Sequence, residues 1–205
     1  MSANYDNSAW FYDRLSRIVY GDALIRAQVY LLEFIPADAT VLIVGGGSGW
    51  ILDEIAKRHS AGLRITYVEV SSKMMVQAKK RNACGNNVVF INDAIENVSF
   101  GSSFDVVLTA FLFDSFSEQT MERVFGHIHS LLKPGGLWVY SDFRPTKKWW
   151  QRLLLKTMLK FFKAVCNIEA SRLPDVEKQF ELHRYTMVES RMFFKNFVIS
   201  MVYRK

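Results

Sequence analysis

The sequence predicts an α/β fold in which a mostly parallel β-sheet is covered by helices on both faces. Short runs of β-branched and apolar residues alternate with longer segments of helical periodicity, which is typical of this arrangement. A glycine-rich turn follows the first run, as expected where a strand passes directly into a helix. Near the end of the chain, two strand-like runs are separated only by Lys195-Asn196. So short a link predicts an antiparallel hairpin.

Seven strands are expected along the chain. The first five are at 40–44, 64–70, 88–92, 104–110 and 137–142, and the hairpin strands are at 187–194 and 197–203. Helices are expected at 50–58, 72–83 and 118–132, with one or two more between residues 9 and 35. Gly85 and Pro134-Gly135-Gly136 stand where two of these helices should end, because glycine favours helix termination and proline cannot continue a helix.

One domain is expected, because 205 residues, half of them hydrophobic, can bury one substantial core but are too few for two ordinary catalytic domains. We divide it into an N-terminal helical cap (1–36), a ligand-binding core (37–142), a basic amphipathic helical insert (143–183) and the hairpin (184–205). The first residues contain no apolar run behind a basic start, and no stretch is long and apolar enough to span a bilayer. A cytoplasmic protein is therefore expected.

No metal site is expected from the cysteines and histidines. These residues are Cys84, Cys166, His59, His127, His129 and His183. The cysteines are far apart and lack CxxC spacing, and the two neighbouring histidines lie two positions apart on an expected helix, so they point in different directions. We interpret the cysteines as free thiols and the histidines as structural or surface residues.

The strongest local motif is VLIVGGGSGW at 41–50, where an apolar strand runs into a glycine-rich loop and then a helix. The loop residues are Gly45, Gly46, Gly47, Ser48 and Gly49. Without a Cβ the backbone turns sharply and approaches a ligand closely, and the helix N-terminus offers unpaired N–H groups. A polar or anionic ligand is therefore expected here. The alternative is a tight strand-to-helix turn with no ligand.

Acidic residues follow the next two strands. Glu69 ends the second strand, where it could accept both ribose hydroxyls of an adenosine ligand, or be a solvated strand end. Asp93-Ala94 follows the third, where the carboxylate could accept the adenine amine, or cap a helix. Together with the glycine loop, these strand ends predict a pocket at the edge where open α/β sheets bind ligands.

These motifs resemble those of class I S-adenosylmethionine-dependent methyltransferases, in particular the small-molecule group that includes the ubiquinone and menaquinone biosynthetic enzymes. VLIVGGGSG resembles the first motif of the family, TYVEVSSKMMVQAKKR its second strand and helix, NDAIENVSFGSSFDVVLTAFLFDSF its adenine-contacting and fourth motifs, and LLKPGGLWVYSDF the start of its fifth strand. The resemblance covers residues 10–142 and, more loosely, the hairpin. It implies a Rossmann-like three-layer sandwich with a seven-stranded sheet, an antiparallel C-terminal hairpin strand, and S-adenosylmethionine as cofactor.

The resemblance also implies roles for particular residues. Gly45, Gly47 and Gly49 would line the methionine moiety, Glu69 would bind the ribose, and Asp93 with Ala94 the adenine; the expected set is completed by Gly46, Ser48, Val70, Thr109 and Ala110. The family usually has an acidic residue two positions before its first glycine, and this chain has Ile43 there. That apolar residue removes a carboxylate that normally helps organise the loop.

The predicted activity is methyl transfer to an unidentified small molecule. The GGG loop also resembles that of aminopropyltransferases, which use decarboxylated S-adenosylmethionine on the same fold. Ile43 favours a third interpretation, a catalytically silent module that keeps the fold to bind a ligand or a partner. A nicotinamide oxidoreductase is disfavoured by the GxGxG spacing, which differs from GxGxxG, and by the hairpin.

Candidate catalytic residues are few, because methyl transfer from a sulfonium requires positioning and exclusion of water and no dedicated base. Asp114 is the only ionisable residue in the segment that ends the fourth strand, where the family places residues facing the methyl group. It could be a base, an acceptor-binding carboxylate, or a cap of the next helix or turn. Tyr12, in a segment resembling the mobile cap of the family, could reach a ligand or pack on the sheet.

The formal net charge of +6 is concentrated in one segment. Residues 143–168 contain seven basic residues and no acidic one, and basic residues recur every three or four positions on an otherwise apolar helix. The segment 147–165 could be a lid over an apolar methyl acceptor, an interfacial helix on an anionic membrane, or a homodimer face. Nucleic acid is not an expected partner, because large apolar residues interrupt the basic ones.

Overall fold

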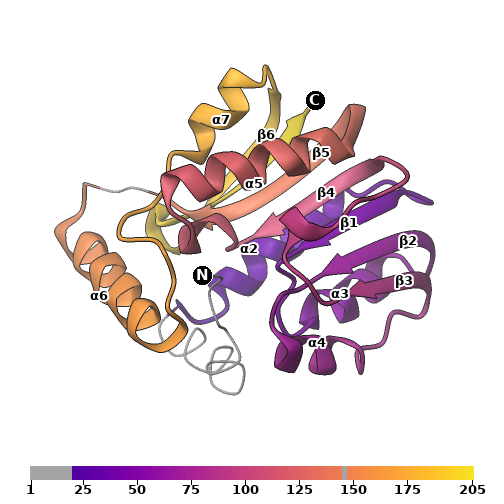
Figure 1. Cartoon of the computed structure of the whole chain (residues 1–205), viewed down its shortest axis with the longest axis horizontal. Helices are drawn as coiled ribbons and strands as arrows, with labels where there is room; N and C mark the ends of the chain where they lie inside the picture. The colour runs from indigo at the N-terminus through magenta and orange to yellow at the C-terminus, as the bar shows by residue number, and fades with distance from the viewer. Residues whose placement is uncertain (1–19, 145–146) are drawn as a thin grey trace.

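A mixed β-sheet runs through the centre of the molecule, with helices on both of its faces (Figure 1). The computed structural model describes residues 20–144 and 147–205. The sheet has seven strands in the order β3-β2-β1-β4-β5-β7-β6. These strands are β1 Thr40–Val44, β2 Ala61–Val68, β3 Gly85–Ile91, β4 Phe104–Ala110, β5 Leu132–Phe143, β6 Thr186–Phe193 and β7 Val198–Arg204.

The strand pairings are parallel from β3 through to β5 and antiparallel at the other edge of the sheet. β7 lies between β5 and β6 and pairs with both in antiparallel fashion. The predicted α/β class, a seven-stranded and mostly parallel sheet with an antiparallel C-terminal hairpin, is therefore confirmed.

The helices divide between the two faces of the sheet. They are α2 Ala23–Leu31, α3 Trp50–Arg58, α4 Ser72–Ala78, α5 Glu118–Leu131, α6 Trp149–Cys166 and α7 Val176–Leu182. Buried residues of α2, α3 and α4 form one hydrophobic cluster with β1 and β2, whereas those of α5 and α7 form another with the opposite face. α6 lies at the periphery, on the side to which β4 points (Figure 1).

Several predicted boundaries differ from the observed ones because distant residues determine them. α4 ends at Ala78, five residues early, because Asp53 of α3 accepts hydrogen bonds from Arg81 and from the backbone of Asn82. β5 already begins at Leu132, so Pro134-Gly135-Gly136 lies within a strand. There Gly135 and Gly136 exchange backbone hydrogen bonds with Lys205, which the local sequence does not indicate.

An aromatic cluster fills the core beneath α5 and α7. The fully buried ring of Trp138 stacks on Phe125 at a centroid distance of 4.6 Å, and Phe180 stacks on Tyr203 at 3.8 Å. The indole Nε1 of Trp138 donates a hydrogen bond to the hydroxyl of buried Thr109 at 2.9 Å. Because a buried N–H without a partner is costly, this bond fixes the side chain of Thr109 within the core.

Thr109→Val should destabilise the fold by about 1–3 kcal/mol, because it leaves the buried indole N–H of Trp138 unpaired. Trp138→Phe should destabilise it as well, through lost packing. In the double variant neither polar group remains, so its cost should be smaller than the sum of the single costs by about 1 kcal/mol. Urea denaturation of the four proteins measures this coupling, and strictly additive costs would contradict it.

Candidate functional site

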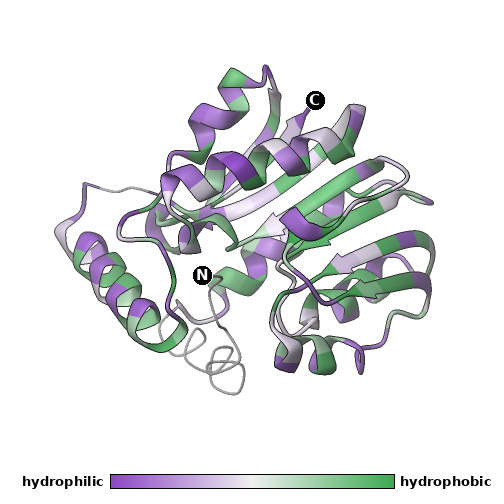
Figure 2. Ribbon diagram, in the orientation of Figure 1, coloured by the Kyte–Doolittle hydropathy of each residue, from purple (hydrophilic) through white to green (hydrophobic). Residues whose placement is uncertain are grey.

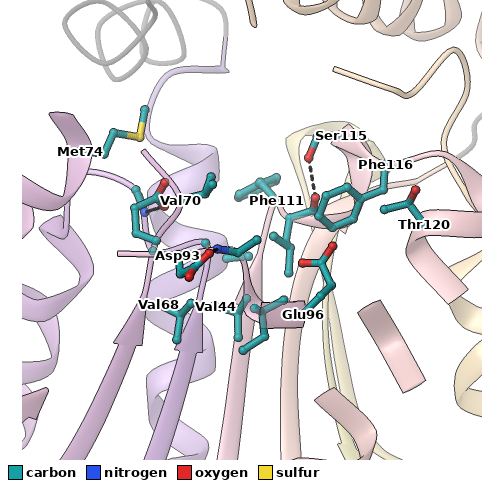
Figure 3. Close-up of a pocket in the computed structure, with 18 of the residues that line it drawn as sticks. Val44, Val68, Val70, Met74, Asp93, Glu96, Phe111, Ser115, Phe116 and Thr120 are labelled. Atoms are coloured by element: carbon teal, nitrogen blue, oxygen red, sulfur yellow. Dashed lines mark hydrogen bonds between the residues drawn. The ribbon is translucent and has the colours of Figure 1, made fainter. Parts of the chain in front are cut away.

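A cavity of about 370 Å³ opens at the carboxyl ends of the parallel strands (Figure 3). Its walls come from the loops that follow β1, β2, β3 and β4, with contributions from α2, α5 and the segment after α6. Nine residues expected from the sequence line it: Gly45, Gly46, Gly47, Ser48, Glu69, Val70, Asp93, Ala94 and Ala110. The position agrees with the rule that open α/β sheets bind ligands at this edge.

The glycine loop after β1 forms one wall of the cavity and requires glycine at several positions. Gly45 and Gly47 have φ values of +68° and +63°, a region that side chains with a Cβ rarely adopt. A Cβ on Gly46 would lie 2.3 Å from the ring of Tyr67. The hydroxyl of Tyr67 donates to the carbonyl of Gly47 at 3.1 Å. The loop is therefore held closely against β2.

Glu69 connects the ends of the first two strands. Its Oε2 accepts the backbone N–H of Gly47 at 2.9 Å, and its Oε1 accepts that of Ser71 at 2.8 Å. The side chain is 4% exposed, so Glu69 is not a solvated strand end. Each carboxylate oxygen can accept more than one hydrogen bond, so a ligand hydroxyl can still bind here.

Asp93 both caps a turn and lines the cavity. Its Oδ1 accepts the backbone N–H of Ala94 at 2.7 Å and the side-chain amide of Asn97 at 2.8 Å, at the start of a 3-10 turn. The carboxylate lies at the cavity wall (Figure 3). Asn92 connects the loop after β3 to the end of β2, because its side-chain amide donates a hydrogen bond to the backbone carbonyl of Glu69 at 2.8 Å.

Four expected site residues are not brought to the described lining of this cavity. Gly49 begins α3 with φ +78°, and a Cβ there would lie 2.6 Å from the backbone of Ala78, so glycine is needed for helix packing. Thr109 points into the core towards Trp138. Asp114 lies in the 3-10 turn Phe113–Ser115, and Tyr12 lies outside the described residues.

Sequence reasoning missed many residues that line the rest of the cavity. The additional lining residues include Gln28, Trp50, Met74, Glu96, Leu112, Phe116, Thr120, Arg123 and Glu169. Glu169 accepts a hydrogen bond from the hydroxyl of Thr120 at 2.6 Å, although the two residues are far apart in sequence. Phe111 also lines the cavity, and its φ is +53°. Strained backbone of this kind is concentrated at functional sites.

Two interacting carboxyl groups lie behind the turn that carries Phe111. Asp142 is 2% exposed; its Oδ1 accepts the backbone N–H of Phe143, and within residues 20–144 and 147–205 its Oδ2 has no hydrogen-bond partner. Burial raises the pKa of Asp142 to about 7. Burial, and then the charge of Asp142, raises the pKa of Asp114 well above its usual range. The pair therefore holds at least one proton at neutral pH.

Comparison with known proteins identifies the family. The sequence profile of a methyltransferase domain matches residues 41–136. The chain is 32% identical over 166 residues to the demethylmenaquinone methyltransferase of Thermotoga maritima. This alignment covers 77% of this chain and 69% of that protein. The chain belongs to the methyltransferase family.

Other methyltransferases share part of the sequence or the whole fold. Malonyl-[acyl-carrier protein] O-methyltransferase 1 of Ilyobacter polytropus is 30% identical over 103 residues, which is half of this chain but only 37% of that protein. The magnesium protoporphyrin IX methyltransferase of Synechocystis PCC 6803, solved with bound S-adenosylhomocysteine, has a TM-score of 0.68 at 16% identity. That alignment covers 98% of this chain and 96% of the other, so this methyltransferase shares the fold over nearly its full length.

Asp142→Asn should remove a pH-dependent cost to folding. The pKa of Asp142 is about 7 in the folded protein against an ordinary value of 3.8, so between these values the folded state binds more protons. Its contribution to stability is therefore complete below pH 3.8 and is lost as the pH rises through about 7. Between about pH 5 and about pH 8, the native protein should lose about 2–3 kcal/mol more unfolding free energy than Asp142→Asn.

Urea denaturation at the two pH values measures this difference. Asp175→Asn is the matched control, because Asp175 is an exposed cap of α7 far from the carboxyl pair. The control should keep the native pH dependence. The same pH dependence in Asp142→Asn would show that folding does not raise the pKa of Asp142.

Proposed function

We propose that the protein transfers the methyl group of S-adenosylmethionine to a small-molecule acceptor. The observation that carries this proposal is the buried carboxylate of Glu69, which is bonded to the backbone of Gly47 and lines the same cavity as Asp93. The glycine loop can receive the methionine part of the cofactor, Glu69 the ribose hydroxyls, and Asp93 the adenine amine. The glycine loop, Glu69 and Asp93 follow successive strands, and each offers hydrogen-bonding groups that suit one part of this cofactor.

The wall beside the glycine loop supports a reaction that depends on positioning. When bound, S-adenosylmethionine supplies an electrophilic methyl group. Phe111, Leu112 and Phe116 line the adjoining part of the cavity with apolar surface, which keeps water from that region. Such a wall holds an acceptor atom in line for transfer and needs no dedicated base.

The acceptor proposed here is a small molecule with an apolar part and a polar part. The apolar side chains of Phe111 and Phe116 can hold the first, and Thr120, Arg123 and Glu169 offer polar groups for the second. The relative from Thermotoga maritima is named as a demethylmenaquinone methyltransferase, which supports a ring-bearing acceptor of this kind. Asp114 and Asp142 are not among the described residues that line the cavity, so we assign neither of them the role of a base.

Calorimetric titration with S-adenosylmethionine, S-adenosylhomocysteine, decarboxylated S-adenosylmethionine and NAD tests the proposal. The first two should bind selectively, and Asp93→Ala should weaken them about tenfold or more, because a charge-assisted hydrogen bond to the adenine amine is lost. Asp175→Ala, which removes a comparable exposed cap outside the cavity, should bind like the native protein. Preference for the decarboxylated compound would indicate aminopropyl transfer. Failure to bind any of the four would indicate a silent fold.

Tyr67→Phe should weaken S-adenosylhomocysteine binding by about two- to tenfold while the fold persists. The variant loses the hydrogen bond from the hydroxyl to Gly47, and a neutral hydrogen bond contributes about 0.5–1.5 kcal/mol. Tyr30→Phe is the control, because Tyr30 packs on Phe34 and Phe193 and does not line the cavity. An unchanged affinity in Tyr67→Phe would mean that this bond does not organise the loop.

A further inference from the structure

One side of α6 carries exposed cations around an exposed tryptophan. At 3.6 residues per turn, four basic residues project within about 80° of one another around the helix axis, and Trp149 lies in the same sector. Trp149 is 74% exposed, and Leu153, at the margin of this sector, is 57% exposed. We call this set the basic face of α6: Trp149, Arg152, Leu153, Lys156, Lys160 and Lys163. Figure 2 shows hydrophilic and hydrophobic residues alternating along the helix.

A groove of about 560 Å³ borders the basic face, between α6 and residues 170–173. Apolar side chains line it, including Leu155, Leu159 and Leu173, while the four cations of α6 and Arg172 stand around it. Across the described ranges, none of the four α6 cations forms an ion pair. The nearest following acid, Glu169, is bonded instead to Thr120. Within residues 20–144 and 147–205, no acidic side chain therefore pairs with these four cations.

We propose that the basic face of α6 docks the protein on an anionic membrane surface, with α6 lying in the plane of the lipid headgroups. Arg152, Lys156, Lys160 and Lys163 contact lipid phosphates, while Trp149 and the adjoining Leu153 enter the boundary between headgroups and acyl chains. No helix in the described parts of the chain is long and apolar enough to cross a bilayer, so the contact is in-plane. This inference does not depend on the proposed methyl transfer.

A membrane surface accounts for the exposed apolar residues as well as for the charge. Nucleic acid would neutralise the cations but would leave Trp149 and Leu153 without a role. A second copy of the chain, packed about a two-fold axis, would bring the same four cations against themselves. An anionic bilayer offers phosphates to the cations and, beside them, an apolar layer to the tryptophan.

Docking in this way would hold the cavity close to the lipid. Glu169, which lines the cavity, follows the last residue of α6 by three positions, and the inner face of α6 packs near Phe111 through Leu154, Leu155 and Met158. The helix that contacts the membrane is therefore also one that covers the acceptor side of the molecule.

Sedimentation of the full chain with vesicles tests this inference. The chain should bind vesicles of phosphatidylcholine and phosphatidylglycerol but not of phosphatidylcholine alone, with a blue shift of tryptophan emission. Lys156→Glu combined with Lys160→Glu should reduce the partition coefficient more than about tenfold, since each cation near such a surface favours binding. Trp149→Ala combined with Leu153→Ser should reduce it about tenfold and abolish the blue shift.

Two control variants separate the basic face from general charge and hydrophobicity. Lys79→Glu combined with Lys80→Glu makes the same change in net charge near α4, and Leu182→Ser removes an exposed leucine of α7. Both should bind vesicles as the native chain does.

The inference would be overturned by equal binding to neutral vesicles, by vesicle binding that the α6 variants leave unchanged, or by binding to duplex DNA in preference to anionic vesicles. A dimer broken by Trp149→Ala, with no vesicle binding, would overturn it in favour of a second copy. Vesicle binding together with no binding of S-adenosylhomocysteine would support it while refuting the proposed function.

Discussion

The hydrogen bond between Glu69 and the backbone of Gly47 is the constraint on which the site depends. The backbone nitrogen of Gly47, in the loop after β1, lies 2.9 Å from Oε2 of Glu69, which follows the end of β2. The same carboxylate also accepts the N–H of Ser71, which caps α4. One buried carboxylate therefore fixes the glycine loop, the start of a helix and one wall of the cavity, and its hydrogen bonds to Gly47 and Ser71 would be lost if it were removed.

Tyr67 and Glu69 together explain how the loop is held although the usual acidic residue before it is replaced by Ile43. Ile43 is fully buried in the cluster that packs β1 against α2 and α3, so a carboxylate at this position would be costly. The restraint on the loop comes instead from β2, through the hydroxyl of Tyr67 and the carboxylate of Glu69. The apolar residue at position 43 is thus compatible with an ordered glycine loop.

The sequence predicted those elements whose ends are determined by neighbouring residues. β1, β4 and α3 have the expected boundaries, because the apolar runs and the glycines that define them lie in the local sequence. The ends of α4 and β5 could not be predicted, since Asp53 and Lys205 determine them from a distance. In the site, the strand-end residues were found, because their positions follow from the periodicity of the strands.

The site features that the sequence did not predict arise where residues distant in sequence come close together in the fold. Asp114 and Asp142 are brought together only by the pairing of β4 with β5. The sequence singled out Asp114 as a candidate base, an acceptor-binding carboxylate or a cap, but it did not indicate that Asp142 lies near it. Glu169 reaches the cavity because the chain returns after α6 to the turn before α5, where the backbone N–H of Glu169 donates to the carbonyl of Ser115. No local pattern signals such a return.

The two ends of the cavity are encoded by different stretches of the chain. The glycine loop, Glu69 and Asp93 belong to the first half of the sequence, whereas Thr120, Arg123 and Glu169 of the opposite wall come later. Substitutions in the later stretch can therefore change the wall formed by Thr120, Arg123 and Glu169 without changing the residues of the earlier one. The wall that comes from the later stretch can thus change during evolution while the glycine loop, Glu69 and Asp93 stay the same.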